Sequence, residues 1–182
     1  MRDYSLGLVL GRFQTLTTGH ELILRRALSL CDRAVVYVGS ADKSGTERNP
    51  FSYELRKSLI ESAFEWEAFS KRIDVLPLND LGAGDNPIWG EYVLSSFKRD
   101  CGRLPDLYIT GCERERPSWF TNGMAPDMDE LRICRSTDAV SATKCRELMR
   151  AGERDRWKAL TPKATWGRFD EMKRILDSIE EN

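Results

Sequence analysis

Residues 7–20, with the sequence GLVLGRFQTLTTGH, limit the possible folds of this chain more than any other feature. A short apolar run ends at Gly11, a polar turn follows, and a segment with apolar residues at helical spacing starts near Gly19. In an open α/β sheet, the first turn of such a helix offers unpaired backbone N–H groups and the positive end of the helix dipole to an anion. The stretch therefore predicts a phosphate site at the end of the first strand. At that place the chain has cations, hydrogen-bond donors and a glycine: Arg12, Gln14, Thr17, Thr18, Gly19 and His20.

The rest of the chain repeats the strand–helix pattern. Uninterrupted apolar runs such as AVVYV at 34–38 are typical of strands covered by helices on both faces. The repeat predicts an α/β fold: a doubly wound, Rossmann-like parallel sheet of about five strands, with helices on both faces and a C-terminal helical segment. Strands are expected at 5–10, 34–38, 73–78, 107–110 and 130–134, and helices at 19–31, 52–64, 88–97, 143–149, 155–160 and 167–179.

Length favours one domain, and composition argues against several kinds of partner. Residues 1–182 are predicted to form a single domain, with 141–182 as its helical C-terminal part. The sequence contains no run of about 18 apolar residues, so no membrane span is predicted. The N-terminus lacks the apolar core of a signal peptide. We therefore expect a cytoplasmic protein that does not bind membranes. With 28 basic and 29 acidic side chains the net charge is −1, which argues against a broad nucleic-acid surface.

The cysteines and the known short motifs exclude several common kinds of site. His20 is the only histidine, and the five cysteines lie far apart without a C-x-x-C pair, so no structural zinc site is expected. We interpret the cysteines as reduced thiols, mostly in the core. Neither G-x-G-x-x-G nor the P-loop pattern is present, so the usual dinucleotide and P-loop sites lack support.

A second anion-binding element is predicted at residues 141–146, SATKCR. Ser141 and Thr143 at a helix start can cap the helix and donate hydroxyl hydrogen bonds to phosphate. Arg146 follows Thr143 by three residues, lies on the same helical face and can reach the same anion. A plain capped helix with a surface arginine is the alternative. On a chain of net charge −1, a polyanionic ligand needs a local cluster of cations, and the candidates are Arg12, Arg48, Lys144 and Arg146.

These segments resemble a known family. Thr17-Thr18-Gly19-His20 resembles the T/H-x-G-H phosphate-binding signature of the nucleotidyltransferase superfamily. The preceding Gly11-Arg12-Phe13-Gln14 is similar to the archaeal-type nicotinamide-nucleotide adenylyltransferase family. Four later segments resemble that family in the same order. They are GSA at 39–41 with RNPF at 48–51, ND at 79–80 with NPIW at 86–89, YITG at 108–111, and SATKCR at 141–146.

The resemblance implies transfer of AMP from ATP to nicotinamide mononucleotide (NMN), giving NAD and pyrophosphate. It implies Mg²⁺ that is bound mainly through the ATP phosphates, with no protein metal ligands. Since related enzymes form dimers to hexamers, it also allows a homo-oligomer. The catalytic residues it implies are His20, Thr17, Arg12 and Arg48; the ATP-binding residues are Gly11, Phe13, Gln14, Gly19, Gly111, Ser141, Thr143 and Arg146; the NMN-binding residues are Ser40, Asp80, Asn86 and Trp89, with the tryptophan against the nicotinamide ring.

Several alternatives stay open at this point. The family mostly has histidine where this chain has Thr17, and a Thr-first T-x-G-H is familiar from phosphopantetheine enzymes. Phosphopantetheine with ATP, or a phosphorylated alcohol with CTP, is therefore the main alternative, and the N-x-x-W and R-N-P-F segments favour NMN over it. A non-catalytic nucleotide sensor is less favoured. A simple helix-start donor for His20 and a core anchor for Trp89 are the structural alternatives.

Overall fold

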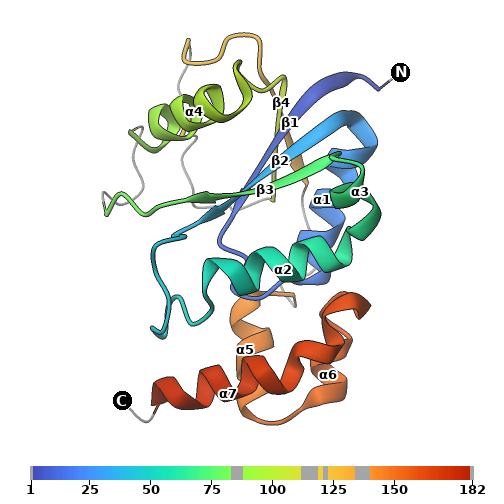
Figure 1. Cartoon of the computed structure of the whole chain (residues 1–182), viewed down its shortest axis with the longest axis vertical. Helices are drawn as coiled ribbons and strands as arrows, with labels where there is room; N and C mark the ends of the chain where they lie inside the picture. The colour runs from blue at the N-terminus through green and yellow to red at the C-terminus, as the bar shows by residue number, and fades with distance from the viewer. Residues whose placement is uncertain (1, 83–87, 112–118, 121–122, 134–139, 181–182) are drawn as a thin grey trace.

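One parallel sheet forms the centre of the structure. The computed structural model describes residues 2–82, 88–111, 119–120, 123–133 and 140–180. Within this part of the chain, five strands pair in the order β3-β2-β1-β4-β5, all parallel (Figure 1). The strands are β1 (Tyr4–Gly11), β2 (Cys31–Gly39), β3 (Ile73–Leu78), β4 (Leu107–Gly111) and β5 (Asp129–Ile133).

Helices cover both faces of this sheet. α1 and α2 pack on one face of the sheet and share one apolar core, and α4 packs on the other face over a second core (Figure 1). The predicted doubly wound α/β fold is therefore confirmed. The helices are α1 (Thr18–Leu30), α2 (Tyr53–Ala63), α3 (Glu65–Phe69), α4 (Ile88–Cys101), α5 (Ala142–Arg150), α6 (Arg154–Lys158) and α7 (Phe169–Glu180), with a 3-10 helix, η1 (Lys163–Arg168), before the last.

The apolar run in β2 explains why two cores can form. Val36 and Val38 lie in the core under α1 and α2, whereas Val35 and Tyr37 lie in the core under α4. Successive side chains of a strand point to opposite faces, so only an unbroken apolar run buries both faces. The Tyr37 hydroxyl is accommodated in this interior because it donates to Asp100 of α4 at 2.6 Å.

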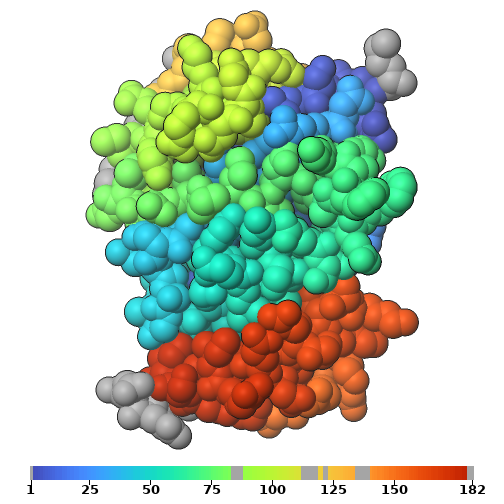
Figure 2. Space-filling view, in the orientation of Figure 1, coloured from blue at the N-terminus to red at the C-terminus, as the bar shows by residue number. Residues whose placement is uncertain are grey.

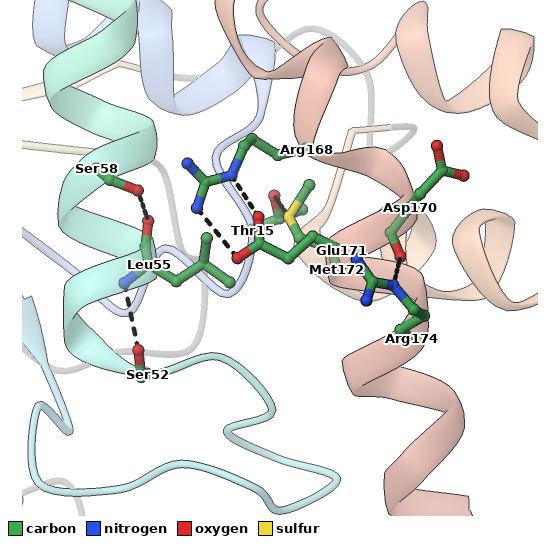
Figure 3. Close-up of polar contacts among 9 residues, drawn as sticks. All are labelled: Thr15, Ser52, Leu55, Ser58, Arg168, Asp170, Glu171, Met172 and Arg174. Carbon is green, nitrogen blue, oxygen red and sulfur yellow. Dashed lines mark hydrogen bonds and ion pairs between the residues drawn. The ribbon is translucent and has the colours of Figure 1, made fainter.

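The C-terminal helices form a further layer against α2 (Figures 1 and 2). Trp157 and Met172 from this layer are buried in the same core as α1 and α2. Figure 3 shows how the layer reaches the turn after β1: the Thr15 hydroxyl lies 3.6 Å from the Met172 sulfur, beside the ion pair of Arg168 with Glu171. The helical segment predicted after residue 141 therefore packs directly on the first motif.

Most element boundaries agree with the sequence-based predictions within a few residues. The predicted N-cap Ser52 is confirmed, since its hydroxyl accepts from the Leu55 N–H at 3.3 Å (Figure 3). Neither the short helix α3 nor the 3-10 helix η1 was predicted, and two boundaries differ. Cys31 is the first residue of β2 rather than the last of the preceding helix, so α1 passes into the strand without a loop. The helix expected from 167 begins at Phe169, after η1.

The chain reverses its direction across the sheet after β3. From this edge strand it crosses through α4 to β4, which lies on the other side of β1 from β2. Neighbouring connections from β1 and from β3 thus leave toward opposite faces, which makes a switch point between β1 and β4. In open α/β sheets, ligands bind at the carboxyl ends of the strands beside such a point. The fold therefore places the candidate site where Gly11 and Gly111 end their strands.

Three of the five cysteines lie in the described residues, and none of the three forms a disulfide. Cys31 and Cys145 are buried and Cys101 is half-buried, as expected for core thiols. Burial raises the pKa of the Cys31 thiol to about 11 and that of Cys145 to about 12, so both stay protonated near neutral pH. The other two cysteines, Cys112 and Cys134, lie outside the described residues.

Among the residues described, none of the helices is both long enough and apolar enough to cross a bilayer.

We predict that Gly7→Ala destabilises the sheet because of Cys31. A Cβ at Gly7 would lie 2.6 Å from the sulfur of Cys31, a residue that is fully buried. Overpacking of this kind costs about 1–3 kcal/mol of unfolding free energy. Urea denaturation of Gly7→Ala, of Cys31→Ala and of the double variant measures it. The double variant should recover most of the Gly7→Ala loss, and strictly additive losses would contradict the contact.

Candidate active site

The first motif forms a reciprocal cap at the start of α1. Thr17 is the N-cap, and its hydroxyl accepts from the His20 N–H at 3.2 Å. In return, the Thr17 N–H donates to Nδ1 of His20 at 3.2 Å. Nδ1 is therefore an acceptor, and in the neutral ring the proton must be on Nε2. The cap thus fixes both the orientation and the tautomer of the imidazole, with Nε2–H as its donor.

Two further contacts hold His20 in place. The Phe13 ring lies against the imidazole, with ring centroids 4.9 Å apart. The N–H of Thr18 donates to the Leu160 carbonyl at 2.9 Å, which ties the first turn of α1 to the C-terminal layer. Gly19 is buried in this same turn. The predicted helix start is confirmed, with Thr18 rather than Gly19 as the first helical residue.

Thr17 is fully buried, at 0 % exposure, and its hydroxyl lies 3.1 Å from Nδ1 of His20. A side chain in that position acts on the imidazole rather than on a ligand outside it. The geometry therefore favours an orienting role for Thr17, and direct contact of this hydroxyl with phosphate stays a prediction.

Gln14 joins the first motif to the R-N-P-F segment. Its side chain is buried, accepts from the Phe51 N–H at 3.0 Å and donates to the Phe51 carbonyl at 3.3 Å. It also lies 3.5 Å from the side-chain oxygen of Asn49. Both polar ends of the amide are used within the protein. The sequence-based assignment of Gln14 to ATP binding is thus accompanied by a structural role, which is to hold the two loops together.

The second motif meets the first through Arg146. Ser141 caps α5 as predicted, since its hydroxyl accepts from the Lys144 N–H at 3.1 Å. Arg146 donates to the Gln14 carbonyl at 2.6 Å and to the Thr143 hydroxyl at 3.3 Å. Its Nε is buried without a hydrogen-bond partner among the described residues. A buried guanidinium N–H of this kind suits an anionic ligand.

The charge environment of Arg146 fits an anion site. Burial lowers its pKa, and the nearby Arg12 guanidinium lowers it further, while Glu47 opposes the shift. Clustered cations that disfavour one another are relieved when a polyanion binds between them. Lys144, a fourth candidate cation, pairs instead with Glu147 at 3.1 Å.

Arg12 and Arg48 are exposed and follow the first two strands. Arg12 comes directly after Gly11, the last residue of β1, and Arg48 lies in the loop between β2 and α2. Glu47, beside Arg48, pairs with Arg150 of α5 at 2.5 Å. This ion pair brings the loop that carries Arg48 to the helix that carries Arg146.

Two of the predicted NMN residues are in direct contact. The Ser40 hydroxyl donates to Asp80 at 2.9 Å, which joins the ends of β2 and β3. The other Asp80 oxygen accepts from the Gly82 N–H at 2.9 Å. Asn86, the third predicted residue, lies outside the described residues.

Trp89 is half-buried in the first turn of α4 and has an aromatic partner that sequence reasoning missed. Its ring is stacked on Trp119 with centroids 5.6 Å apart and 22° between planes. Gly90 allows this contact, since a Cβ there would lie 2.1 Å from the Trp119 carbonyl oxygen. Nothing in the spacing of residues 111–126 predicts the pair, because Trp119 lies outside the helices and strands.

Arg56 is the other residue that the sequence did not single out. It lies on α2 at 0 % exposure and donates only to backbone carbonyls among the described residues. The signal was present: an arginine on the apolar face that also carries Leu55, Leu59 and Ile60.

Comparison with known proteins identifies the family. The cytidylyltransferase-like family profile matches residues 8–77. The chain is 31% identical over 169 residues to a nicotinamide-nucleotide adenylyltransferase from Pyrococcus horikoshii, covering 93% of this chain and 84% of the relative. The enzyme from Thermococcus kodakarensis is 31% identical over 170 residues, with the same two coverages. The chain belongs to the nicotinamide-nucleotide adenylyltransferase family.

Solved structures share the fold of this family member at low sequence identity. A bifunctional NMN adenylyltransferase/ADP ribose pyrophosphatase from Francisella tularensis superimposes with a TM-score of 0.76 at 18% identity, over 97% of this chain. The chain spans about half of that protein, 52%. A putative nicotinate-nucleotide adenylyltransferase from Vibrio parahaemolyticus gives a TM-score of 0.64 at 10% identity, over 95% of both chains. These likenesses establish the fold.

We predict that the stability of this adenylyltransferase fold depends on the N-cap hydroxyl at position 17 rather than on the size of the side chain there. Thr17→Val keeps the shape but loses the hydroxyl that accepts from the His20 N–H. Loss of an N-cap costs about 0.5–2 kcal/mol of unfolding free energy. Thr17→Ser keeps the hydroxyl and should lose much less. Urea unfolding of both variants measures the difference, and equal stability of the two would contradict the role of the cap.

Proposed function

We propose that this chain transfers AMP from ATP to NMN, forming NAD and pyrophosphate. The observation that carries the proposal is the 2.6 Å hydrogen bond from Arg146 to the Gln14 carbonyl. It joins two motifs that are far apart in the sequence, at the carboxyl edge of the sheet. The starts of α1 and α5 would thereby hold the phosphates of one nucleotide between them. Membership of the adenylyltransferase family supports NMN as the acceptor.

The proposed reaction needs no protein nucleophile. A phosphate oxygen of NMN attacks the α-phosphorus of ATP in line, the new P–O bond forms, and the bond to the bridging oxygen of pyrophosphate breaks. Catalysis is then positioning plus stabilisation of the developing negative charge. His20 supplies its Nε2–H to an oxygen of the transferring phosphoryl group, and Thr17 orients the ring through the cap.

The remaining cations and hydroxyls are assigned to the other phosphates. Arg146 with Ser141 and Thr143 would hold the β- and γ-phosphates, while Arg12 and Arg48 would neutralise charge at the reacting end. Mg²⁺ enters with ATP as part of the substrate and is held mainly by its phosphates. The solved relative from Francisella tularensis was crystallised with AMP and a manganese ion, which supports a divalent metal. Gly11, Phe13, Gly19 and Gly111 would shape the pocket walls.

The nicotinamide end of NMN is assigned to the ends of β2 and β3 and to the start of α4. Ser40 and Asp80 stand at the ends of β2 and β3, and Asn86 is proposed for the same loop. The Trp89–Trp119 pair offers an aromatic surface to the cationic pyridinium ring, whose attraction to an aromatic face is electrostatic.

Other acceptors form the second candidate function. Thr17 in the T-x-G-H motif is shared with phosphopantetheine enzymes, so phosphopantetheine with ATP and a phosphorylated alcohol with CTP are tested alongside NMN. A non-catalytic nucleotide sensor is the third. Mass spectrometry of the products from a panel of acceptors with ATP and CTP separates all three, because NAD forms only under the first.

We also propose the setting in which the chain works. Residues 1–182 would form a single nucleotidyltransferase domain, since the C-terminal layer shares its core with α1 and α2. The unpaired thiols of Cys31, Cys101 and Cys145 suit the reducing cytoplasm. A homo-oligomer would be consistent with the exposed aromatic pair Trp66 and Phe69 on α3. Sedimentation of the purified chain measures the oligomeric state.

We predict that His20→Ala lowers kcat for NAD formation by about a hundredfold, which is about 2.7 kcal/mol of lost transition-state stabilisation. The cause is the loss of the Nε2–H donor at the start of α1. The N-cap hydroxyl of Thr17 remains, so the circular dichroism spectrum should stay that of the wild type. A folded variant with nearly full kcat would remove His20 from the mechanism.

We predict that Trp89→Ala raises KM for NMN about five- to thirtyfold and leaves KM for ATP nearly unchanged. The expected loss is about 1–2 kcal/mol of stacking and cation–π attraction to the pyridinium ring. The core-anchor alternative predicts similar damage to both substrates together with a large fall in melting temperature. Trp119→Ala serves as the companion variant, because it removes the ring partner and leaves α4 complete.

A further inference from the structure

Arg56 joins the ends of two central strands. Its Nη1 donates to the Arg12 carbonyl at 2.9 Å and to the Gly39 carbonyl at 2.8 Å. Its Nη2 donates to the Ser40 carbonyl at 3.0 Å, and its Nε to the Ser52 carbonyl at 3.1 Å. These acceptors stand directly at the carboxyl ends of β1 and β2 and at the N-cap of α2. One side chain therefore sets the spacing of the two loops that leave these strands.

Arg56 places a positive charge in the protein interior, and burying a charge costs free energy. Burial lowers its pKa to about 10, and the nearby Arg12 guanidinium also lowers it, yet the group stays charged near neutral pH. A buried charge is unfavourable unless polar groups surround it. Here the surrounding groups are carbonyl oxygens, which a neutral or shorter side chain would leave without these donors. The main-chain positions of Arg12 and Ser40 thus depend on a single guanidinium.

Arg72 provides a comparison within the same molecule. It also donates to backbone carbonyls, those of Leu28, Cys31 and Asp32, at 2.6, 3.4 and 3.3 Å. These carbonyls lie at the end of α1 and the start of β2, which is the opposite edge of the sheet from the candidate site. Arg72 therefore has the same kind of contacts without a connection to the reacting groups.

We propose that Arg56 is a positioning residue for adenylyl transfer. It acts through the main chain of Arg12 and Ser40, and so fixes the loop that carries the reacting-end cation against the loop that faces NMN. The inference rests on the proposed function and adds to it a residue that touches neither substrate. Because ATP is held by the α1 and α5 helix starts, loss of Arg56 disturbs the approach of the two substrates more than the binding of ATP.

The test compares Arg56→Lys and Arg56→Met with Arg72→Lys and Arg72→Met. For each folded variant, kcat and both KM values for NAD formation are measured well below the melting temperature. Misplacement of reacting groups by about 1 Å costs about a hundredfold in rate, so we expect kcat of the Arg56 variants to fall about 10- to 100-fold, with KM for ATP within about twofold. The Arg72 variants should lose thermal stability and keep kcat. If Arg56→Met does not fold, Arg56→Lys gives the same comparison.

A double variant tests whether Arg56 acts through the Arg12 loop. Adding Arg56→Lys to Arg12→Ala should lower kcat far less than Arg56→Lys does alone, because the group it positions is already absent. Additive losses would overturn the proposal, and so would Arg56 variants whose kcat matches that of Arg72 variants of equal stability. A wild-type chain that forms no NAD would instead overturn the proposed function itself, and the role of Arg56 in it.

Discussion

The reciprocal hydrogen bonds between Thr17 and His20 are the interaction on which the site depends. They close the first turn of α1, which needs a partner for its unpaired N–H groups in any case. The same bonds use Nδ1 of the imidazole and leave Nε2–H as its donor. A helix start disfavours a charged imidazolium, which agrees with a neutral ring that donates one hydrogen bond. Secondary structure and chemistry are thus determined by one set of contacts, and a change at Thr17 affects both.

The C-terminal layer completes this arrangement from a distance in sequence. Arg146 reaches the Gln14 carbonyl, and the Leu160 carbonyl accepts from the first turn of α1. Gln14 in turn holds Phe51, and Arg56 holds the carbonyls that end β1 and β2. Apart from the backbone bond to Leu160, these anchors are polar side chains that bond to the backbone. Surface ion pairs contribute little to stability, so we attribute the placement of these loops to the backbone contacts.

The sequence predicts the elements well and the tertiary contacts of the site poorly. The apolar runs of the strands and the caps at Ser52 and Ser141 are local signals, and each was confirmed, whereas the cap at Thr17 was not predicted. The stacking of Trp89 on Trp119 joins segments without a shared period, so no pattern could reveal it. An arginine on the apolar face of α2 is a visible signal, but the carbonyls that Arg56 contacts were not predictable from it. The motif residues were found through resemblance, which identifies a residue but not what its side chain contacts. Thr17 illustrates this, since its burial was visible only in the structure.

The most direct test of this account is the protonation of one ring. His20 is the only histidine of the chain, so a protein labelled with ¹⁵N-histidine gives a single pair of imidazole nitrogen signals in NMR. The account predicts, near neutral pH, an unprotonated Nδ1 and a protonated Nε2, with the Nε2 signal shifting when a non-hydrolysable ATP analogue is added. A ring protonated on Nδ1, or a charged ring, or an Nε2 signal that the analogue leaves unchanged would contradict the central claim.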